Sequence, residues 1–167
     1  AQFNSIPLWA GEHSSPNTKT TKVVFDASFK NYRPTTTAYW FYFYQALTTI
    51  EGWDNLNTSD VTDMMSMFEK CSALETLDLK TFNTTKVVDM RAMFQDCSTL
   101  KTLNVTSFNT ESVKLMGSMF ENCSSLETLD LKSFDTKNVE DMGGLFKTCS
   151  TLKTLDLKSF DTRNVQS

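Results

Sequence analysis

The sequence predicts an α/β fold, a right-handed solenoid of stacked repeats with a parallel sheet on its concave face and short helices on its convex face. Three observations predict it. One 26-residue unit recurs in register, the same apolar columns return in every copy, and each copy contains a stretch with a strand period followed by one with a helix period. The four copies begin at Cys71, Cys97, Cys123 and Cys149. A single unit of this size cannot bury its own apolar face, so its copies must stack.

The columns that stay apolar identify the expected core. Between them Lys, Glu, Asp, Asn, Ser and Thr vary freely, as expected of solvated positions. A Thr column two residues after the first Phe, at Thr84 in the first copy, is expected to tie down a turn through its hydroxyl group. The Met residues share their columns with apolar neighbours and are expected to fill the core. In the first copy the core columns are Leu74, Leu77, Leu79, Phe82, Val87, Met90 and Phe94.

Two periods alternate within each unit. Residues 77–79 alternate apolar and polar side chains, which predicts a short strand with its Leu residues pointing inward. Further along, apolar residues follow one another at steps of three, three, one and three, which predicts a short amphipathic helix. These residues are Val87, Met90, Met93, Phe94 and Cys97. We therefore expect strand, turn, helix and turn in each unit, with parallel strands about 4.8 Å apart.

One domain with three segments is expected. Residues 57–167 are the regular repeats, residues 23–56 are divergent capping repeats, and residues 1–22 are an N-terminal tail or linker. The divergent segment aligns with the regular units at a step of 27, which places one inserted residue near Trp53 and a first strand at residues 23–25. The aromatic residues 39–44 are expected to seal the end of the core. In the tail, Phe3, Ile6, Leu8 and Trp9 either dock on this cap or belong to a free tail.

Composition and the chain ends narrow the function classes. A net charge of -4 and a pI near 5.0 leave no basic stripe, so nucleic acid is not an expected partner. No apolar run approaches the ~18 residues of a transmembrane segment. The sequence starts at Ala1 without a signal peptide, so we expect any export signal to have been removed or never present. It stops at Ser167, where a further helix should begin, so either the natural chain continues or this end is open.

The Cys column admits two chemical interpretations and a structural one. Two disulfides would be possible in a secreted chain, but Cys residues beside helices packed about 8–10 Å apart lie beyond disulfide reach. A metal site is not expected, because no two Cys residues are closer than 26 positions and the only His is His13. We predict a buried, reduced Cys column that behaves as a small apolar group, with no metal and no cofactor.

Catalysis finds no support in the sequence. The single His lies in a polar segment, no Ser or Cys has a base placed near it by the repeat, and the five Gly form no phosphate-binding loop. The nearest approach to a catalytic set is the column of Asp78, Asp130 and Asp156, on an open sheet without a pocket to shift a pKa. We predict that the protein is not an enzyme.

The side chains that point out of the strands form three columns, one of Thr, one mainly acidic and one mainly Lys. Beside them Glu75, Lys101, Glu127 and Lys153 alternate in sign. Either this is a solvated face whose exposed ion pairs contribute roughly 0–1 kcal/mol each, or it docks a partner protein, as concave solenoid faces do. We take all residues of the three columns except Thr106 as candidate partner-binding residues. They are Thr76, Asp78, Lys80, Thr102, Asn104, Thr128, Asp130, Lys132, Thr154, Asp156 and Lys158.

The segment MFEKCSALETLDLKTFNTTKVVDM and its copies closely resemble the BspA-like, or Treponema-type, leucine-rich repeat of bacterial surface proteins. The lead-in TTIEGWDNLNTSDVTDM also looks like the start of such arrays, and the resemblance covers roughly residues 35–165. It implies a leucine-rich-repeat fold and a secreted or cell-surface protein of host-associated bacteria. Some members bind extracellular-matrix or plasma proteins or mediate contact between cells. The motif implies no catalytic or ligand residues, since its fixed positions are the core columns.

Together these observations predict an exported bacterial binding module that presents its strand face to a protein partner, with adhesion or host-protein interaction as the role. The alternative is a structural spacer or self-assembling surface element without a specific ligand. In that case the last strand, near Leu155–Leu157, pairs with another copy, because an unpaired strand edge is a template for strand addition.

Overall fold

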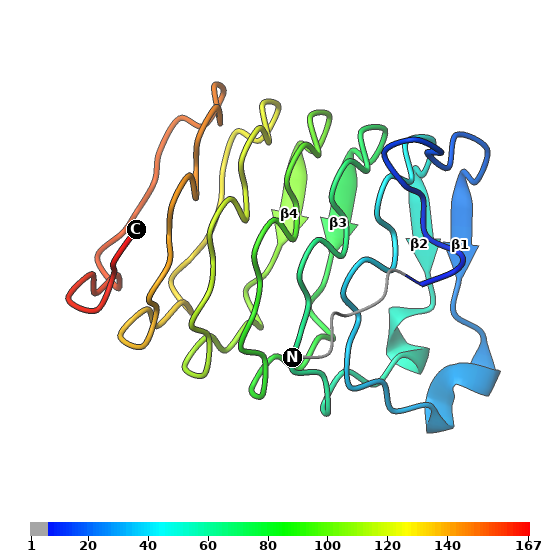
Figure 1. Ribbon diagram of the computed structural model, residues 1–167, viewed down its shortest axis with the longest axis horizontal. Coiled ribbons are helices and arrows are strands. Elements are labelled where there is room, and N and C mark those ends of the chain that lie inside the picture. Colours follow the sequence, from blue (N-terminus) through cyan, green and yellow to red (C-terminus); the bar gives the residue numbers. More distant parts are fainter. Residues whose placement is uncertain (1–6) are drawn as a thin grey trace.

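The computed structural model describes residues 7–167, which form coils that follow one another in a single row (Figure 1). On one side, β1 (Lys22–Val24) pairs in parallel with β2 (Thr49–Glu51), and β3 (Thr76–Asp78) pairs in parallel with β4 (Thr102–Asn104). On the other side, isolated parallel bridges run from Thr36 through residues 63, 89 and 115 to Asp141. We call these the strand side, residues 76–80 and their equivalents, and the turn side, residues 89–96 and theirs.

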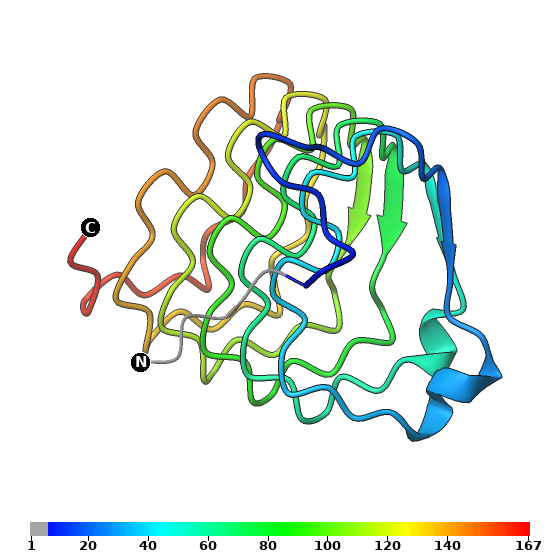
Figure 2. The ribbon, with the colours of Figure 1, turned by 45° about the vertical axis from the view of Figure 1, so that its right-hand side comes forward.

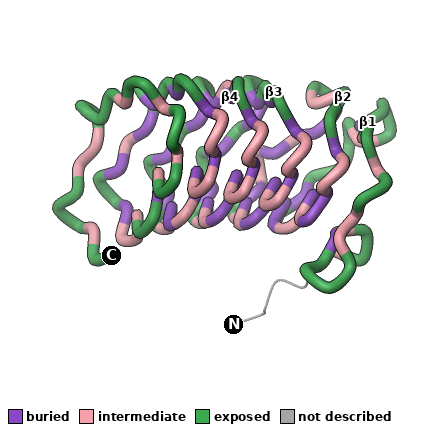
Figure 3. The backbone as a smooth tube through the Cα atoms, turned by 90° about the horizontal axis from the view of Figure 1, so that it is seen from above, coloured by how far each residue is buried: buried purple, intermediate pink, exposed green. Residues whose placement is uncertain are grey.

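The repeats stack as their spacing predicts. Leu77 lies opposite Leu103 in the β3–β4 pair, and both are buried. Rings from adjacent coils stack in columns, with centroids 5.7 Å apart for Phe68–Phe94, Phe94–Phe120 and Phe120–Phe146. Figure 3 shows buried segments recurring from coil to coil along the row, except in the last coil, where residues 149–167 are exposed or partly buried. The Leu, Val, Met and Phe columns therefore form one continuous core.

The first two coils follow a longer step, as predicted. β1 pairs with β2 at a separation of 27 residues, and Thr36 Oγ1 donates to the Asp63 carbonyl at the same separation. Each of these coils contains a 3-10 helix after its strand, η1 (Ala27–Asn31) and η2 (Trp53–Asn55). Gly52, the N-cap that precedes η2, has a φ of 78° and lies so close to the Phe25 backbone that a Cβ would meet its carbonyl oxygen at 2.1 Å. The extra residue is thus taken up near Trp53.

The predicted convex helices are wrong, and so is the helical part of the fold class. Within residues 7–167 the structure has only the two 3-10 helices and no α-helix. Where a helix was expected, Ala92 and Asp96 have positive φ, as do their equivalents in other coils, which breaks a right-handed helix. The N–H groups of residues 64, 66, 68 and 70 instead donate to carbonyls of residues 89, 91, 93 and 95 in the next coil, at 2.8–2.9 Å.

The size of the coil step explains this difference. Packed helices need about 8–10 Å between their axes, whereas strands need about 4.8 Å, and the stacked Phe68 and Phe94 rings lie only 5.7 Å apart. Successive β-turns, such as Met67 N–H to Met64 carbonyl and Cys71 N–H to Phe68 carbonyl, place apolar residues at the same three-residue steps as a helix. Without wider helices opposite the strands, the reason for expecting a concave strand face is gone.

The predicted continuous parallel sheet is also wrong. The strand side holds two separate two-stranded sheets, and residues 128–130 and 154–156 are extended without forming a ladder. Beside the strands the Phe82–Phe108 and Phe108–Phe134 rings are 6.5 and 6.3 Å apart, wider than the stack that follows the turn side. The hydrogen bonds that join one coil to the next along the array are therefore more regular on the turn side than on the strand side.

The buried Thr column links coils rather than closing turns within one coil. Thr110 Oγ1 donates to the Asp135 carbonyl at 2.8 Å and accepts the Asp135 N–H at 2.8 Å. Thr58, Thr84 and Thr136 make the same pair of bonds to the next coil. Each hydroxyl group thus satisfies two backbone groups at once, which explains why this position is Thr in every copy.

The N-terminal segment is not a free linker. Residues 11–17 lie against the first coil, where the Gly11 N–H donates to the Tyr42 carbonyl at 2.8 Å and the Asn17 N–H donates to the Phe43 carbonyl at 3.0 Å. Trp9 packs edge-on against Trp40, whereas Leu8 is fully exposed. The first strand lies one residue earlier than predicted, at Lys22–Val24. The hypothesis that Phe3 and Ile6 dock on the cap lies outside the described residues.

Candidate partner-binding face

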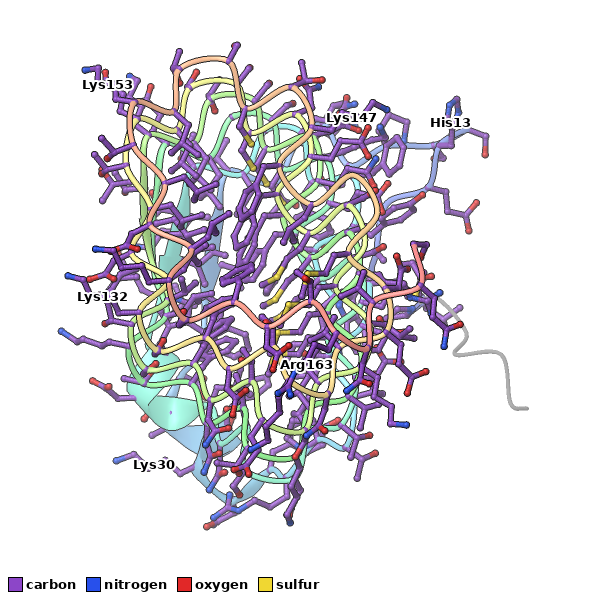
Figure 4. The ribbon with its side chains drawn as sticks, turned by 90° about the vertical axis from the view of Figure 1, so that its left-hand side faces the viewer. His13, Lys30, Lys132, Lys147, Lys153 and Arg163 are labelled. Carbon is purple, nitrogen blue, oxygen red and sulfur yellow. The ribbon has the colours of Figure 1, made fainter. Side chains whose placement is uncertain are left out.

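The candidate residues lie together along the strand side, which we call the strand face. All of them are exposed except Asn104, which is partly buried. Figure 4 looks along the array and shows Lys132 and Lys153 pointing outward on the strand side, with sulfur atoms inside the coils and Lys147 on the opposite side. The face therefore brings together the predicted Thr, acidic and Lys columns, although β3 and β4 are its only hydrogen-bonded strands among residues 76–167.

The acidic column has a structural task. The Asp78, Asp130 and Asp156 side chains accept the backbone N–H two residues later, at 3.1 Å in each case. The same carboxylates lie 3.6–3.9 Å from the Lys ammonium groups of their own coils. Asn104 occupies the column in the second copy, and its amide donates to Asp78 Oδ1 at 2.8 Å. These carboxylates close the turns after the strands, so they are less free for a ligand than their exposure suggests.

The neighbouring charge column forms pairs between coils. Lys101 Nζ lies 2.9 Å from Glu75 Oε2, and Lys153 pairs with Glu127 one coil further on. The hydrogen bond from Lys153 lowers the pKa of Glu127 below its ordinary value. The alternation of sign read from the sequence is therefore realised as two exposed ion pairs.

A groove opens in the face between the last two coils. It has a volume of about 570 Å³ and is lined by six candidate residues, Thr128, Asp130, Lys132, Thr154, Asp156 and Lys158. The Lys153 N–H donates to the Glu127 carbonyl at its rim, but the described residues show no ladder between 128–130 and 154–156. The charged side chains here are exposed as the sequence predicts, but the missing ladder between these two coils is not predicted by it.

The Cys column is structural. All four Cys residues are free, and Cys71, Cys97 and Cys123 are buried. Each thiol donates to a Phe carbonyl of the preceding coil, as Cys97 Sγ does to Phe68 at 3.1 Å. Burial raises the pKa of these thiols well above the ordinary value. The prediction of a reduced, buried column is confirmed for Cys71, Cys97 and Cys123, whereas Cys149 is free but only partly buried.

Residues 7–167 contain no cluster of three or more His, Cys, Asp and Glu side chains that could hold a metal ion. In the same part of the chain, no helix has the length and apolar character to cross a membrane.

Sequence reasoning missed a pocket at the N-terminal end. It has a volume of about 510 Å³ and lies between β1, η1 and the aromatic run. Trp9, Phe25, Phe29, Tyr32 and Trp40 supply most of its wall. The aromatic density of residues 39–44 was read only as a seal, because the sequence could not show that η1 and Trp9 would close around the other rings.

Comparisons with known proteins identify a family and a similar solved structure. No curated protein matches the chain. A crystal structure of a leucine-rich repeat protein from Eubacterium ventriosum ATCC 27560 is similar at 17% sequence identity with a TM-score of 0.40, over 87% of this chain and 47% of that one. The chain thus spans about half the length of that structure. A family model described as "Mycoplasma protein of unknown function, DUF285" matches residues 35–129 and 62–167. The chain therefore belongs to the DUF285 family.

Proposed function

We propose that the chain is a non-enzymatic protein-binding module of an exported bacterial protein, built as a BspA-like leucine-rich-repeat solenoid. Its strand face docks a partner protein of the host, such as a matrix or plasma protein, and the role is adhesion or host interaction. The observation that carries the proposal is the groove between the last two coils, because it combines exposed charged columns with two backbone segments, 128–130 and 154–156, that form no ladder. Stacked repeats commonly present such extended surfaces to other proteins.

The test is a binding screen against an array of host matrix and plasma proteins, followed by charge reversal on the face. Lys132→Glu with Lys158→Glu suits this purpose, because both side chains are exposed and their Asp partners lie 3.8–3.9 Å away. Changing the Asp residues instead would break the turns that they close. We expect binding to weaken about tenfold or more.

The matched control is Lys86→Glu with Lys114→Glu, which also removes two exposed ion pairs but away from the strand face. This control should keep full binding. A screen without any partner, or equal binding by both double variants, would rule out the strand face as the docking surface.

A structural spacer that self-associates is the second candidate. In the last coil Leu155 is only partly buried and Leu157 is 40% exposed, whereas the equivalent Leu129 and Leu131 are buried. A second copy adding a strand there would cover both side chains. Sedimentation across a wide concentration range tests this idea, since a chain that stays monomeric throughout would exclude it.

A further inference from the structure

The N-terminal end of the array is closed on the turn side. Within the array, carbonyls of residues 67 and 69 accept N–H groups from residues 41 and 43 of the preceding coil. The equivalent carbonyls of the first coil, at Trp40 and Tyr42, are taken by the Trp9 indole N–H at 3.2 Å and the Gly11 N–H at 2.8 Å. The chain's own N-terminal segment thus occupies the place of a preceding coil, so another coil cannot stack there.

The strand side of the same end stays open. Thr21 and Phe25 bond toward β2, through the Thr21 carbonyl and the Phe25 N–H. Backbone groups alternate in direction along a strand, so the N–H and C=O groups of Lys22 and Val24 point away from the array. Within the described residues these four groups have no backbone partner. Figure 1 shows β1 at the end of the row with no strand beyond it.

The aromatic pocket borders this free edge. Val23 and Val24 of β1 form part of its wall, and the side chains of Trp9, Val24 and Tyr32 are 57%, 53% and 50% exposed. β1 has a short length and one charge, Lys22, which are common protections of a strand edge, but its half-exposed Val24 faces solvent beside exposed aromatic rings. An edge strand next to an apolar pocket is the arrangement by which domains bind extended peptides, since the backbone supplies affinity and the pocket supplies specificity.

The charge of the segment that contains β1 and η1 indicates which peptide fits. Residues 17–34 contain Lys19, Lys22, Lys30 and Arg33 but only one acidic residue, Asp26, although the whole chain has a net charge of -4. Lys22 pairs with Glu51, whereas Lys30 has no ion pair among the described residues and lies in η1, whose Phe29 lines the pocket. Figure 2 brings this end forward and shows β1 and η1 following one another along its edge. Figure 4 shows Lys30 pointing away from the coils.

We propose that the outer edge of β1 and the adjoining aromatic pocket bind an extended acidic peptide of a partner protein, which adds as a further strand and places one apolar side chain in the pocket. The capped turn side leaves room for a single strand but not for a coil, so a second copy stacked head to tail does not fit. The proposal rests on the proposed role as a protein-binding module but places the contact at the end of the array.

The probe is a short acetylated peptide that alternates glutamate and valine around a central phenylalanine. Its binding is followed by the fluorescence of Trp9 and Trp40, which line the pocket, and by calorimetry. Two control peptides test the chemistry: one is methylated on alternate backbone nitrogens, which blocks strand addition, and one carries lysine in place of glutamate. We expect saturable binding of the probe, and about tenfold or greater weakening for each control peptide.

Variants locate the site. Val24→Asp should weaken binding of the probe about tenfold or more, whereas Val88→Asp, at another exposed Val outside the pocket, should not. Lys30→Glu should weaken binding at low salt, with the difference shrinking as salt screens the charge. Thermal unfolding of each variant checks that the first coil is intact.

Three outcomes would overturn the proposal: no binding of the probe, equal binding of the methylated and parent peptides, or unchanged binding by Val24→Asp. The Lys30→Glu variant, whose side chain is exposed, keeps the test decisive if Val24→Asp proves unstable. Binding of a matrix or plasma protein that depends on Lys132 and Lys158 would survive such a failure, so the two functions can be separated.

Discussion

Replacing one buried Thr of the column that joins the coils should cause an unusually large loss in the free energy of unfolding. Thr110 is 1% exposed, and its hydroxyl group makes two hydrogen bonds of 2.8 Å to the backbone of Asp135 in the next coil. Thr110→Val keeps the shape of the side chain but faces that N–H and C=O with a methyl group. A hydrogen bond contributes about 0.5–1.5 kcal/mol and an unpaired buried group costs about 1–3 kcal/mol, so we expect a loss of about 2–4 kcal/mol.

Urea unfolding followed by circular dichroism measures this loss. Thr128→Val is the matched control, because Thr128 is exposed and its change should stay within about 0.5 kcal/mol. Thr110→Ser keeps the hydroxyl group and should recover most of the stability. If Thr110→Val and Thr128→Val unfold at the same urea concentration, the bonds between coils do not hold the array together. Because each coil contacts only its neighbours, the transition of Thr110→Val should also broaden as the two parts uncouple.

Further predictions concern the core, the thiols, the backbone and pH. Phe94→Ala should lower the free energy of unfolding, measured in urea, by about 3–5 kcal/mol, because the ring is fully buried between two others. Phe160→Ala in the last coil should lower it by less, and equal losses would contradict this expectation. In the native protein a thiol reagent should modify Cys149 first, because the other three thiols are buried, and simultaneous labelling of all four would refute it. Thr148→Gly should raise stability by about 1 kcal/mol, since Thr148 has a φ of 61°, and a loss in thermal unfolding would count against strain there. A hydrogen bond from Lys147 lowers the pKa of the Glu121 carboxyl group in the folded state. The stabilisation that this pair gives the fold is therefore present above the unfolded-state pKa of Glu121 and is lost as the pH falls through its folded-state pKa. Glu121→Gln should therefore flatten the acid limb of the stability–pH curve, and an unchanged limb would exclude this pair as a contributor.

The sequence predicted the stacking because the same apolar residue returns at each step. Leu77 and Leu103 lie opposite one another, and Phe68, Phe94 and Phe120 stack ring on ring. It also predicted the reduced Cys column, but the supporting argument was wrong. That argument placed the Cys residues beside packed helices, and the structure has none there. The thiols are free, and each donates to a carbonyl group of the preceding coil.

The turn side shows why the helices could not be separated from turns in the sequence. Successive β-turns place Met90, Met93 and Phe94 on one face at nearly the same steps as a helix. Whether the segment forms a helix or a series of turns depends on whether its N–H groups bond within the segment or to the next coil. The distance between coils decides this. The N-terminal pocket was equally hidden, because Trp9 and Tyr32 are brought to Trp40 by segments without a repeat.

By itself the repeated sequence determined which side chains share the interior, which columns face solvent and that one coil lies on the next, because burial depends on a pattern that can be read residue by residue. Only the tertiary structure decided where the backbone hydrogen bonds go, since alternate N–H groups on the turn side find their acceptors about one repeat away, while the N–H groups between them close local turns. The missing helices, the interrupted strand side and the half-open N-terminal end all follow from those long-range partners, which no local period encodes.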